Sequence, residues 1–105
     1  MKKSQKERLI SMKDAVTELM LFIQNQKSGR MPRSYSLLDN MRNNIELFVL
    51  LSDEEGDVRM LDAILFRDWC AANEEWYEFT ETGKWGKDLF RDFLGLLEQI
   101  EEYFP

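Results

Sequence analysis

The sequence predicts an all-α fold: a single-domain bundle of about four amphipathic helices spanning residues 1–105. Apolar residues recur at spacings of three and four along most of the chain. Only two prolines are present, Pro32 and the terminal Pro105, so long stretches are free to be helical. With 105 residues, 44% of them hydrophobic, the chain is large enough to build one core of its own.

The first helix is predicted over residues 5–27. Ser4 suits the N-cap position, and Glu7 three residues later completes a capping box. Gly29 follows the helix and can take the left-handed conformation that ends one. The apolar side chains between them share one face: Leu9, Met12, Val16, Leu19, Met20 and Ile23.

The second helix is predicted over residues 36–52, after a loop at residues 28–35 that contains Pro32. Ser34 or Ser36 can cap it. Residues 45–51 are apolar enough to form a strand, but no second strand-like run exists to pair with them. The predicted inner face consists of Leu37, Leu38, Met41, Ile45, Phe48 and Val49, and Leu47, Leu50 and Leu51 extend the apolar surface around the helix.

The third helix is predicted over residues 57–73 and the fourth over residues 87–103. Acids at Asp53, Glu54, Glu55 and Asp57 favour a helix start, because they meet its partial positive charge. The third apolar face carries Val58, Leu61, Leu65, Trp69 and Ala72, and the pattern fades near Asn73. The fourth, after Gly83 and Gly86, carries Leu89, Phe93, Leu96, Leu97 and Ile100. Gly95 in its middle costs about 1 kcal/mol relative to alanine.

The residue inventory excludes most catalytic chemistry. The chain has no histidine and one cysteine, which removes histidine-dependent triads, thiolate metal sites and an internal disulfide. Cys70 lies among apolar residues, so we expect a small, partly buried side chain. An EF-hand beginning at Asp53 would need Gly and Glu where Val58 and Ile64 stand. We therefore predict no enzymatic activity, no catalytic residues, no metal site and no cofactor.

Charge is distributed unevenly along the chain. The net charge is −6; residues 1–33 carry a net charge of +5 and residues 34–105 a net charge of −11. One interpretation is that the helix faces are simply solvated and differ in the sign of their charge. Another is that an acidic surface binds a basic partner or the basic end of a second copy. The predicted third helix sets Arg59 and Arg67 against Asp57, Asp62 and Asp68, which disfavours direct binding of nucleic acid.

One segment combines acids and aromatics at unusual density. Ten residues, 73–82, hold four acids and three aromatic side chains. The predicted partner-binding residues are Glu74, Glu75, Trp76, Tyr77, Glu78, Phe79 and Glu81. The alternative is that the aromatics complete the core or tie the third helix to the fourth. Trp76 and Phe79 share a helical face that Tyr77 does not, so we expect at least one aromatic to point outward.

These features favour a non-enzymatic acidic protein-binding module, comparable in size and charge with inhibitors and toxin-neutralising immunity proteins, that occludes a basic surface on a protein partner. The alternative hypothesis is a self-associating structural or regulatory protein, such as a small transcription-associated regulator. It would form a homodimer through Leu47, Leu50, Leu51 and Leu94. The sequence carries no signal-peptide pattern and no membrane-spanning run, so we expect a cytoplasmic protein with no membrane partner.

Overall fold

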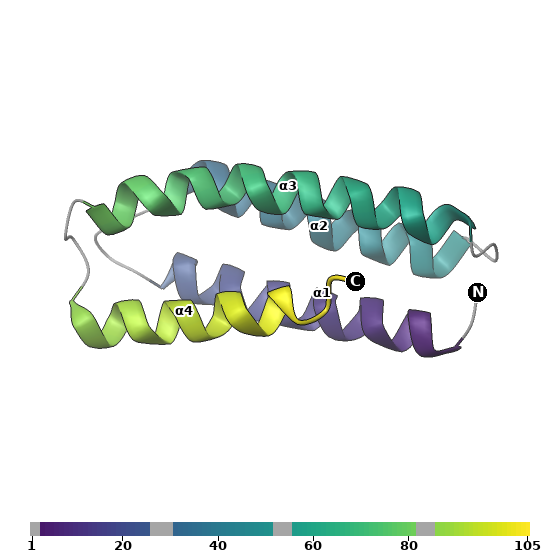
Figure 1. Ribbon diagram of the computed structural model, residues 1–105, viewed down its shortest axis with the longest axis horizontal. Helices are drawn as coiled ribbons and strands as arrows, with labels where there is room; N and C mark the ends of the chain where they lie inside the picture. The colour runs from purple at the N-terminus through teal and green to yellow at the C-terminus, as the bar shows by residue number, and fades with distance from the viewer. Residues whose placement is uncertain (1–2, 26–30, 52–55, 82–85) are drawn as a thin grey trace.

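Four α-helices make up the chain in a computed structural model that describes residues 3–25, 31–51, 56–81 and 86–105 (Figure 1). They are α1 (Lys3–Gln24), α2 (Pro32–Leu51), α3 (Gly56–Glu81) and α4 (Lys87–Glu101). Side chains are described in these ranges except at 3–4, 56–57, 78–81 and 87. No strand occurs in the described ranges, so the predicted all-α bundle of four helices is confirmed.

The helices form two layers. In Figure 1, α2 and α3 lie together on one side, and α1 and α4 lie on the other. Close backbone contacts join α2 to α3, α1 to α2 and α1 to α4, whereas α3 and α4 approach each other much less closely. The molecule measures 44 × 20 × 20 Å, an elongated shape that follows from helices packed lengthwise.

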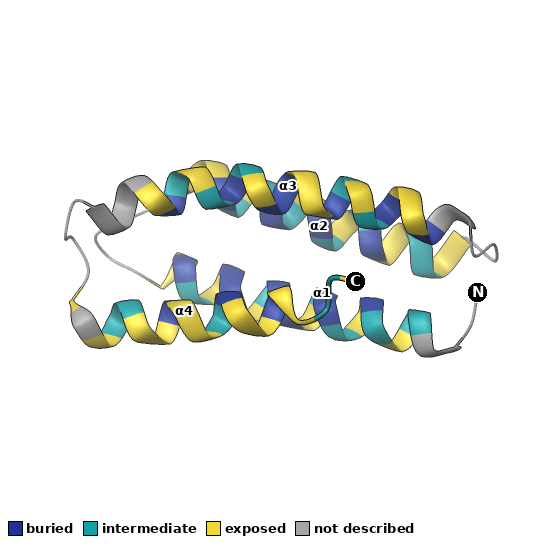
Figure 2. Cartoon of the chain, in the orientation of Figure 1, coloured by how far each residue is buried: buried dark blue, intermediate teal, exposed yellow. Residues whose placement is uncertain are grey.

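The core forms between the layers from the predicted apolar faces. Figure 2 shows the buried positions of each helix turned toward the other layer. The residues on the predicted faces that are buried are Leu9, Met12, Val16, Leu19, Met20, Ile23, Leu38, Met41, Ile45, Val58, Leu61, Leu65, Trp69, Ala72, Phe93, Leu97 and Ile100. Fully burying a large aliphatic or aromatic side chain contributes about 1.5–3 kcal/mol, so these faces supply the main driving force for folding.

The second helix begins at Pro32, four residues earlier than predicted. Proline suits a first helical position because it has no N–H to leave unpaired. The next two N–H groups, of Arg33 and Ser34, donate to the two carboxylate oxygens of Glu75 at 3.2 and 3.0 Å. Ser34, predicted as a cap, instead lies inside the helix, where its hydroxyl donates to the carbonyl of Ala72 at 3.0 Å. A carboxylate from α3 therefore caps α2.

The third helix continues to Glu81, eight residues beyond the predicted end. No glycine or proline interrupts residues 73–81. Asn73 stays helical, and its side-chain amide donates to the Trp69 carbonyl one turn earlier at 2.8 Å. Trp76, four residues after Ala72, is buried and extends the apolar stripe of α3. The acidic and aromatic segment 74–81 is therefore helical.

Several predicted terminal features lie outside the described residues. These are Gly29, Asp53, Glu54, Glu55 and Gly83, together with the side chain of Asp57. The side chain of Ser4 is also outside them, although its backbone lies within α1, whose first residue is Lys3. The first helix ends at Gln24 and the fourth at Glu101, two or three residues before their predicted ends.

Candidate functional site

The predicted partner-binding residues occupy the last turns of α3 and lie in different environments. Trp76 is buried in the core. Its ring meets the rings of Trp69 and Phe93 edge-on, with centroids 5.0 and 5.5 Å apart. Phe93 belongs to α4, so Trp76 ties α3 to α4, as the alternative interpretation of this segment expected.

Glu75 is committed to the fold, because both of its carboxylate oxygens accept hydrogen bonds from the first turn of α2. Glu74 and Tyr77 point outward and are exposed. Glu74 forms a long ion pair of 3.7 Å with Arg33, and both side chains are well exposed. The side chains of Glu78, Phe79 and Glu81 lie outside the described residues. Partner binding by this segment stays a prediction.

A row of mostly apolar residues on α3 faces a similar row on α4; we call the two rows together the α3–α4 seam. The α3 row repeats at alternating spacings of four and three, and the α4 row does the same. Such spacing places each row on one helical face. The seam consists of Asp62, Phe66, Trp69, Asn73 and Trp76 on α3, and of Phe90, Leu94, Leu97, Glu101 and Phe104 on α4 and the turn after it.

Large side chains, rather than close backbones, bridge the seam. The rings of Phe66 and Phe104 meet edge-on at 5.7 Å, and Phe104 also lies 6.2 Å from Trp69. The indole Nε1 of Trp69 donates to Glu101 at 3.3 Å. Because interhelical distance depends on the side chains at the contact, these aromatics hold α3 and α4 apart.

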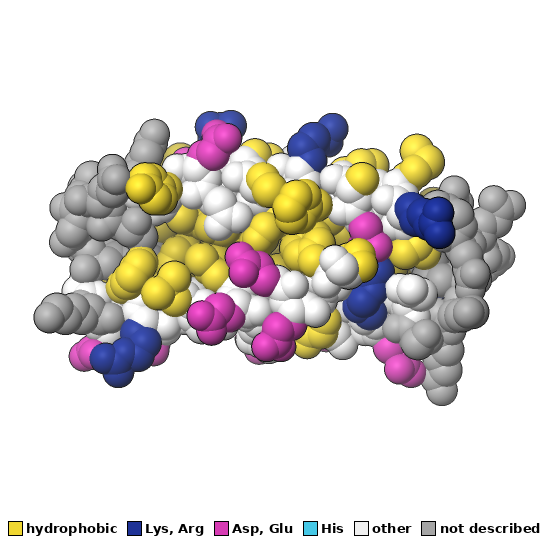
Figure 3. Space-filling model, viewed as in Figure 1, with side chains coloured by type: hydrophobic (Ala, Val, Ile, Leu, Met, Phe, Trp, Pro, Cys, Tyr) yellow, Lys and Arg dark blue, Asp and Glu magenta, His cyan; other side chains and the backbone are white. Residues whose placement is uncertain are grey.

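Apolar side chains remain in view along the seam, and acids lie beside them on α4 (Figure 3). Phe66 is 56% exposed and Leu94 is 39% exposed. Glu98, Glu101 and Glu102 are exposed on α4. Sequence reasoning missed the seam, although its signal was present in the alternating spacing of each row.

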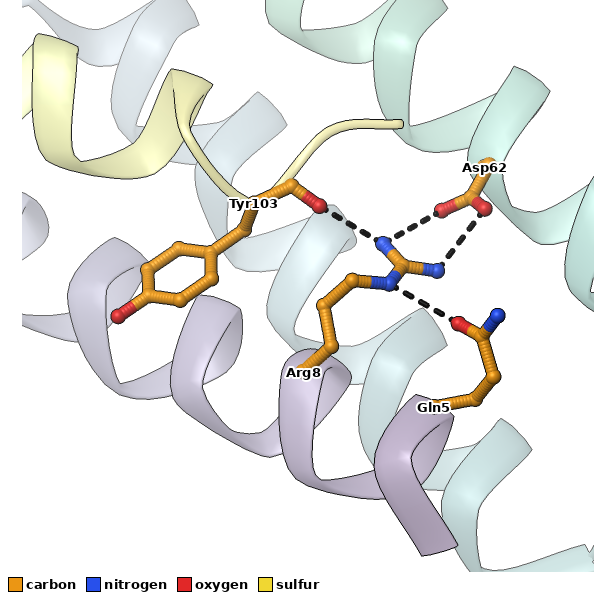
Figure 4. A network of polar contacts seen from close by, with 4 residues as sticks. All are labelled: Gln5, Arg8, Asp62 and Tyr103. Carbon is orange, nitrogen blue, oxygen red and sulfur yellow. Dashed lines mark hydrogen bonds and ion pairs between the residues drawn. The ribbon is translucent and has the colours of Figure 1, made fainter. Parts of the chain in front are cut away.

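A polar cluster closes one end of the seam (Figure 4). Arg8 of α1 donates from Nη1 and Nη2 to the two carboxylate oxygens of Asp62, at 3.2 and 3.0 Å. Its Nη1 also donates to the backbone carbonyl of Tyr103 at 2.8 Å, and its Nε donates to the side chain of Gln5 at 3.0 Å. The guanidinium thereby joins α1, α3 and the residues after α4.

A hollow of about 560 Å³ lies between the end of α1 and the start of α2. It is lined by Ile23, Gln24, Met31, Pro32, Tyr35, Ser36 and Asp39. Its carboxylate, Asp39, already pairs with Arg42 at 2.6 Å.

The described residues place no group of three or more cysteine, aspartate or glutamate side chains where it could hold a metal ion. Cys70 is exposed rather than partly buried as predicted, because it follows Trp69 by one residue and so lies about 100° around the helix from the core. Within the described part of the chain, no helix is both long and apolar enough to span a bilayer.

The sequence matches no protein-family model, and no curated protein or solved structure shows significant similarity to it.

Proposed function

We propose that this chain is a non-enzymatic acidic protein-binding module that acts like an inhibitor by covering a basic surface of a protein partner. The single observation that carries the proposal is the charge of the described surface. Exposed acids occur on all four helices and at the end of α4: Glu7, Asp14, Glu18, Glu46, Glu74, Asp88, Asp92, Glu98, Glu101 and Glu102.

Among the described side chains, fewer cations than acids are exposed. The exposed arginines among the described side chains are Arg33, Arg59, Arg67 and Arg91. All but Arg59 pair with a carboxylate, at 3.7, 3.8 and 3.9 Å: Arg33 with Glu74, Arg67 with Asp68 and Arg91 with Asp88. The outward chemistry is therefore carboxylate, which attracts a basic partner, accelerates its association and disfavours acidic competitors.

Within the predicted segment, Glu74 and Tyr77 support this proposal because both are exposed. Glu75 and Trp76 are engaged inside the fold, so their substitution would confuse a loss of binding with a loss of stability. On α4, Glu98 and Glu102 have no basic partner within the described residues and can be reversed in charge without breaking a described contact.

Charge reversal on α4 tests the proposal. Immobilised wild-type chain would capture binding proteins from the cells that make it, and the affinity of each purified protein would be measured between about 50 and 500 mM salt. Glu98→Lys with Glu102→Lys should weaken the complex at least about tenfold and flatten its dependence on salt. The matched variant, Glu7→Lys with Glu18→Lys on α1, changes the net charge equally, so the comparison separates the effect of the α4 acids from that of total charge. An affinity that does not depend on salt, or is unchanged in the α4 variant, would contradict the proposal.

A second candidate function, self-association as a homodimer, is favoured by one specific observation. Leu47, Leu50 and Leu51 are all exposed on the last two turns of α2. Leu94 does not extend this surface, because it lies on α4, which packs mainly against α1. Sedimentation equilibrium at micromolar concentration should detect a dimer that Leu50→Ser with Leu51→Ser abolishes; a wild-type monomer would exclude this candidate.

A further inference from the structure

We infer that the α3–α4 seam binds one amphipathic helix of the protein partner, with its apolar side over Phe66 and Leu94 and its lysine or arginine residues along the α4 edge. This inference rests on the proposed function and names the surface and the partner segment. An amphipathic helix lying in a groove between two helices is a recurrent mode of peptide recognition.

The apolar part of the inference follows from how the bundle is packed. Three pairs of helices make close backbone contacts, but α3 and α4 meet through side chains alone over most of their length. Phe66 and Leu94 remain exposed at this junction, and Phe90 and Phe104 are half-buried. Covering these side chains would remove apolar surface from water, and the rings present it with little side-chain entropy to lose.

The charges of the two edges differ. Along the α4 edge, Arg91 pairs with Asp88 near the start of the helix, and Glu98, Glu101 and Glu102 follow toward its end. The α3 edge opposite carries exposed Cys70 and Tyr77 together with Arg67 and Glu74, and these two charged side chains pair with Asp68 and Arg33. A helix placed along the seam therefore meets more carboxylates on the α4 side than on the α3 side, where the charged side chains are already paired. The occupant that complements both is apolar on one face and basic along one edge.

The length of the seam sets the length of the occupant. Residues 66 to 77 of α3 span about 16 Å, since a helix rises about 1.5 Å per residue. About three helical turns of a partner, with apolar side chains spaced by three and four residues, match this distance.

The exposed face of α1 and the exposed end of α2 in a second copy are poor occupants, because neither combines exposed apolar side chains with an exposed lysine or arginine among the described residues. The exposed face of α1 carries Glu7, Ile10, Asp14, Glu18 and Leu21. The exposed end of α2 carries Glu46, Leu47, Leu50 and Leu51. Both would bring acids or uncharged residues to the acidic edge of α4, and like charges disfavour that contact.

Binding of a synthetic peptide tests the inference. The probe is a capped peptide of about 14 residues with leucine along one helical face and lysine beside it, and the control is a scrambled peptide of equal composition. In about 50 mM salt, the amphipathic peptide should bind at least about tenfold more tightly than the scrambled one. Tryptophan fluorescence reports binding, since Trp69 lies in the seam, and calorimetry gives the affinity.

Substitutions then locate the site. Phe66→Ser with Leu94→Ser should weaken binding of the amphipathic peptide at least about tenfold, and Glu98→Lys with Glu102→Lys should do the same. The matched control, Leu21→Ser with Leu50→Ser, removes two exposed apolar side chains elsewhere and should change the affinity less than about twofold. Circular dichroism and a thermal melt check that every variant is folded.

Photo-cross-linking gives a second measurement that does not depend on any substitution in the protein. A benzophenone group on the apolar face of the peptide should attach to residues 66–77 or 90–104 of the wild-type chain. Attachment mainly to α1 or α2 would overturn the inference, as would equal binding in the seam variant.

The failures of the two proposals are distinguishable. Equal binding of both peptides, lost only on charge reversal of α4, would leave the acidic binding function intact and overturn the helix in the seam. Absence of binding by either peptide would overturn the inference. The proposed function would then be decided by the salt dependence of the captured complexes. A dimer abolished by the seam variant would assign the seam to a second copy and also overturn the inference.

Discussion

Arg8 and Asp62 form a two-bonded ion pair that is largely shielded from water, with 21% and 14% of their side chains exposed (Figure 4). The two residues are 54 positions apart in the sequence. Because Arg8 also binds the carbonyl of Tyr103, this pair fixes the end of α4 to α1 and α3. Parallel hydrogen bonds between a guanidinium and a carboxylate are strong and directional.

Breaking this pair should be costly. Asp62→Asn replaces one acceptor oxygen by an amide donor and leaves the guanidinium partly buried beside it, so the free energy of unfolding should fall by about 2 kcal/mol. The matched control is Asp39→Asn, which breaks the Arg42–Asp39 pair, where 37% and 39% of the side chains are exposed. Its effect should stay below about 0.5 kcal/mol. Urea denaturation measures both, and equal losses would contradict this interpretation.

Glu75→Ala should destabilise the bundle by about 1 kcal/mol, because the N–H groups of Arg33 and Ser34 lose their acceptor at the start of α2. Glu75→Gln keeps one carbonyl oxygen and should lose less. Its neighbour Glu74 makes only a long, exposed ion pair, so Glu74→Ala should change stability by less than about 0.3 kcal/mol. Hydrogen exchange of the first turn of α2 should accelerate in the Glu75 variants alone.

Gly95→Ala should raise the free energy of unfolding by about 1 kcal/mol. Gly95 lies inside α4, and a Cβ added there would meet no atom within 4 Å. Gly86 offers equal space but occupies the N-cap of α4, where alanine is less favourable than glycine. Gly86→Ala should therefore give no gain. Thermal melts compare the two variants. Equal stabilisation by Gly95→Ala and Gly86→Ala would contradict the placement of Gly95 inside α4 and of Gly86 at its N-cap.

Trp76→Phe should lower the free energy of unfolding by about 1 kcal/mol less than Trp69→Phe does. Both changes remove the same volume from the core, but the buried Nε1 of Trp76 has no hydrogen-bond partner within the described structure, whereas Nε1 of Trp69 donates to Glu101. Removing an unpaired buried N–H relieves a desolvation cost of about 1–3 kcal/mol. Guanidinium denaturation measures the free energy of unfolding of both variants. A greater loss of stability in Trp76→Phe than in Trp69→Phe would contradict the assignment of an unpaired Nε1 to Trp76.

The repeating apolar positions of each helix predicted most of the core, because helical periodicity is local and can be recognised from one segment at a time. The same reasoning ended the third helix near Asn73, although Trp76 continues the stripe of Trp69 and Ala72. It also began the second helix too late. The acceptor that caps α2 at Pro32 belongs to Glu75, more than 40 residues away, and no local pattern reports such a distant partner.

The candidate site also combines features that can be recognised in the sequence with features that depend on contacts between distant residues. The acids and aromatics of residues 74–81 stand out in the sequence, yet their environments depend on what each side chain meets on neighbouring helices. Trp76 enters the core against Phe93, Glu75 caps α2, and Glu74 and Tyr77 face outward. The row containing Phe66 and the row containing Leu94 become one surface only when α3 and α4 lie beside each other.

The sequence by itself determined the four helices, their inward faces and the excess of carboxylates, because these properties depend on residue type and on spacing within a single helix. The tertiary structure decided which helices are neighbours, and hence that Arg8 meets Asp62, that Glu75 caps α2 and that α3 and α4 leave apolar side chains exposed between them. The physical reason is that these contacts join residues distant in the chain, and their geometry is set by how the side chains of whole helices fit together.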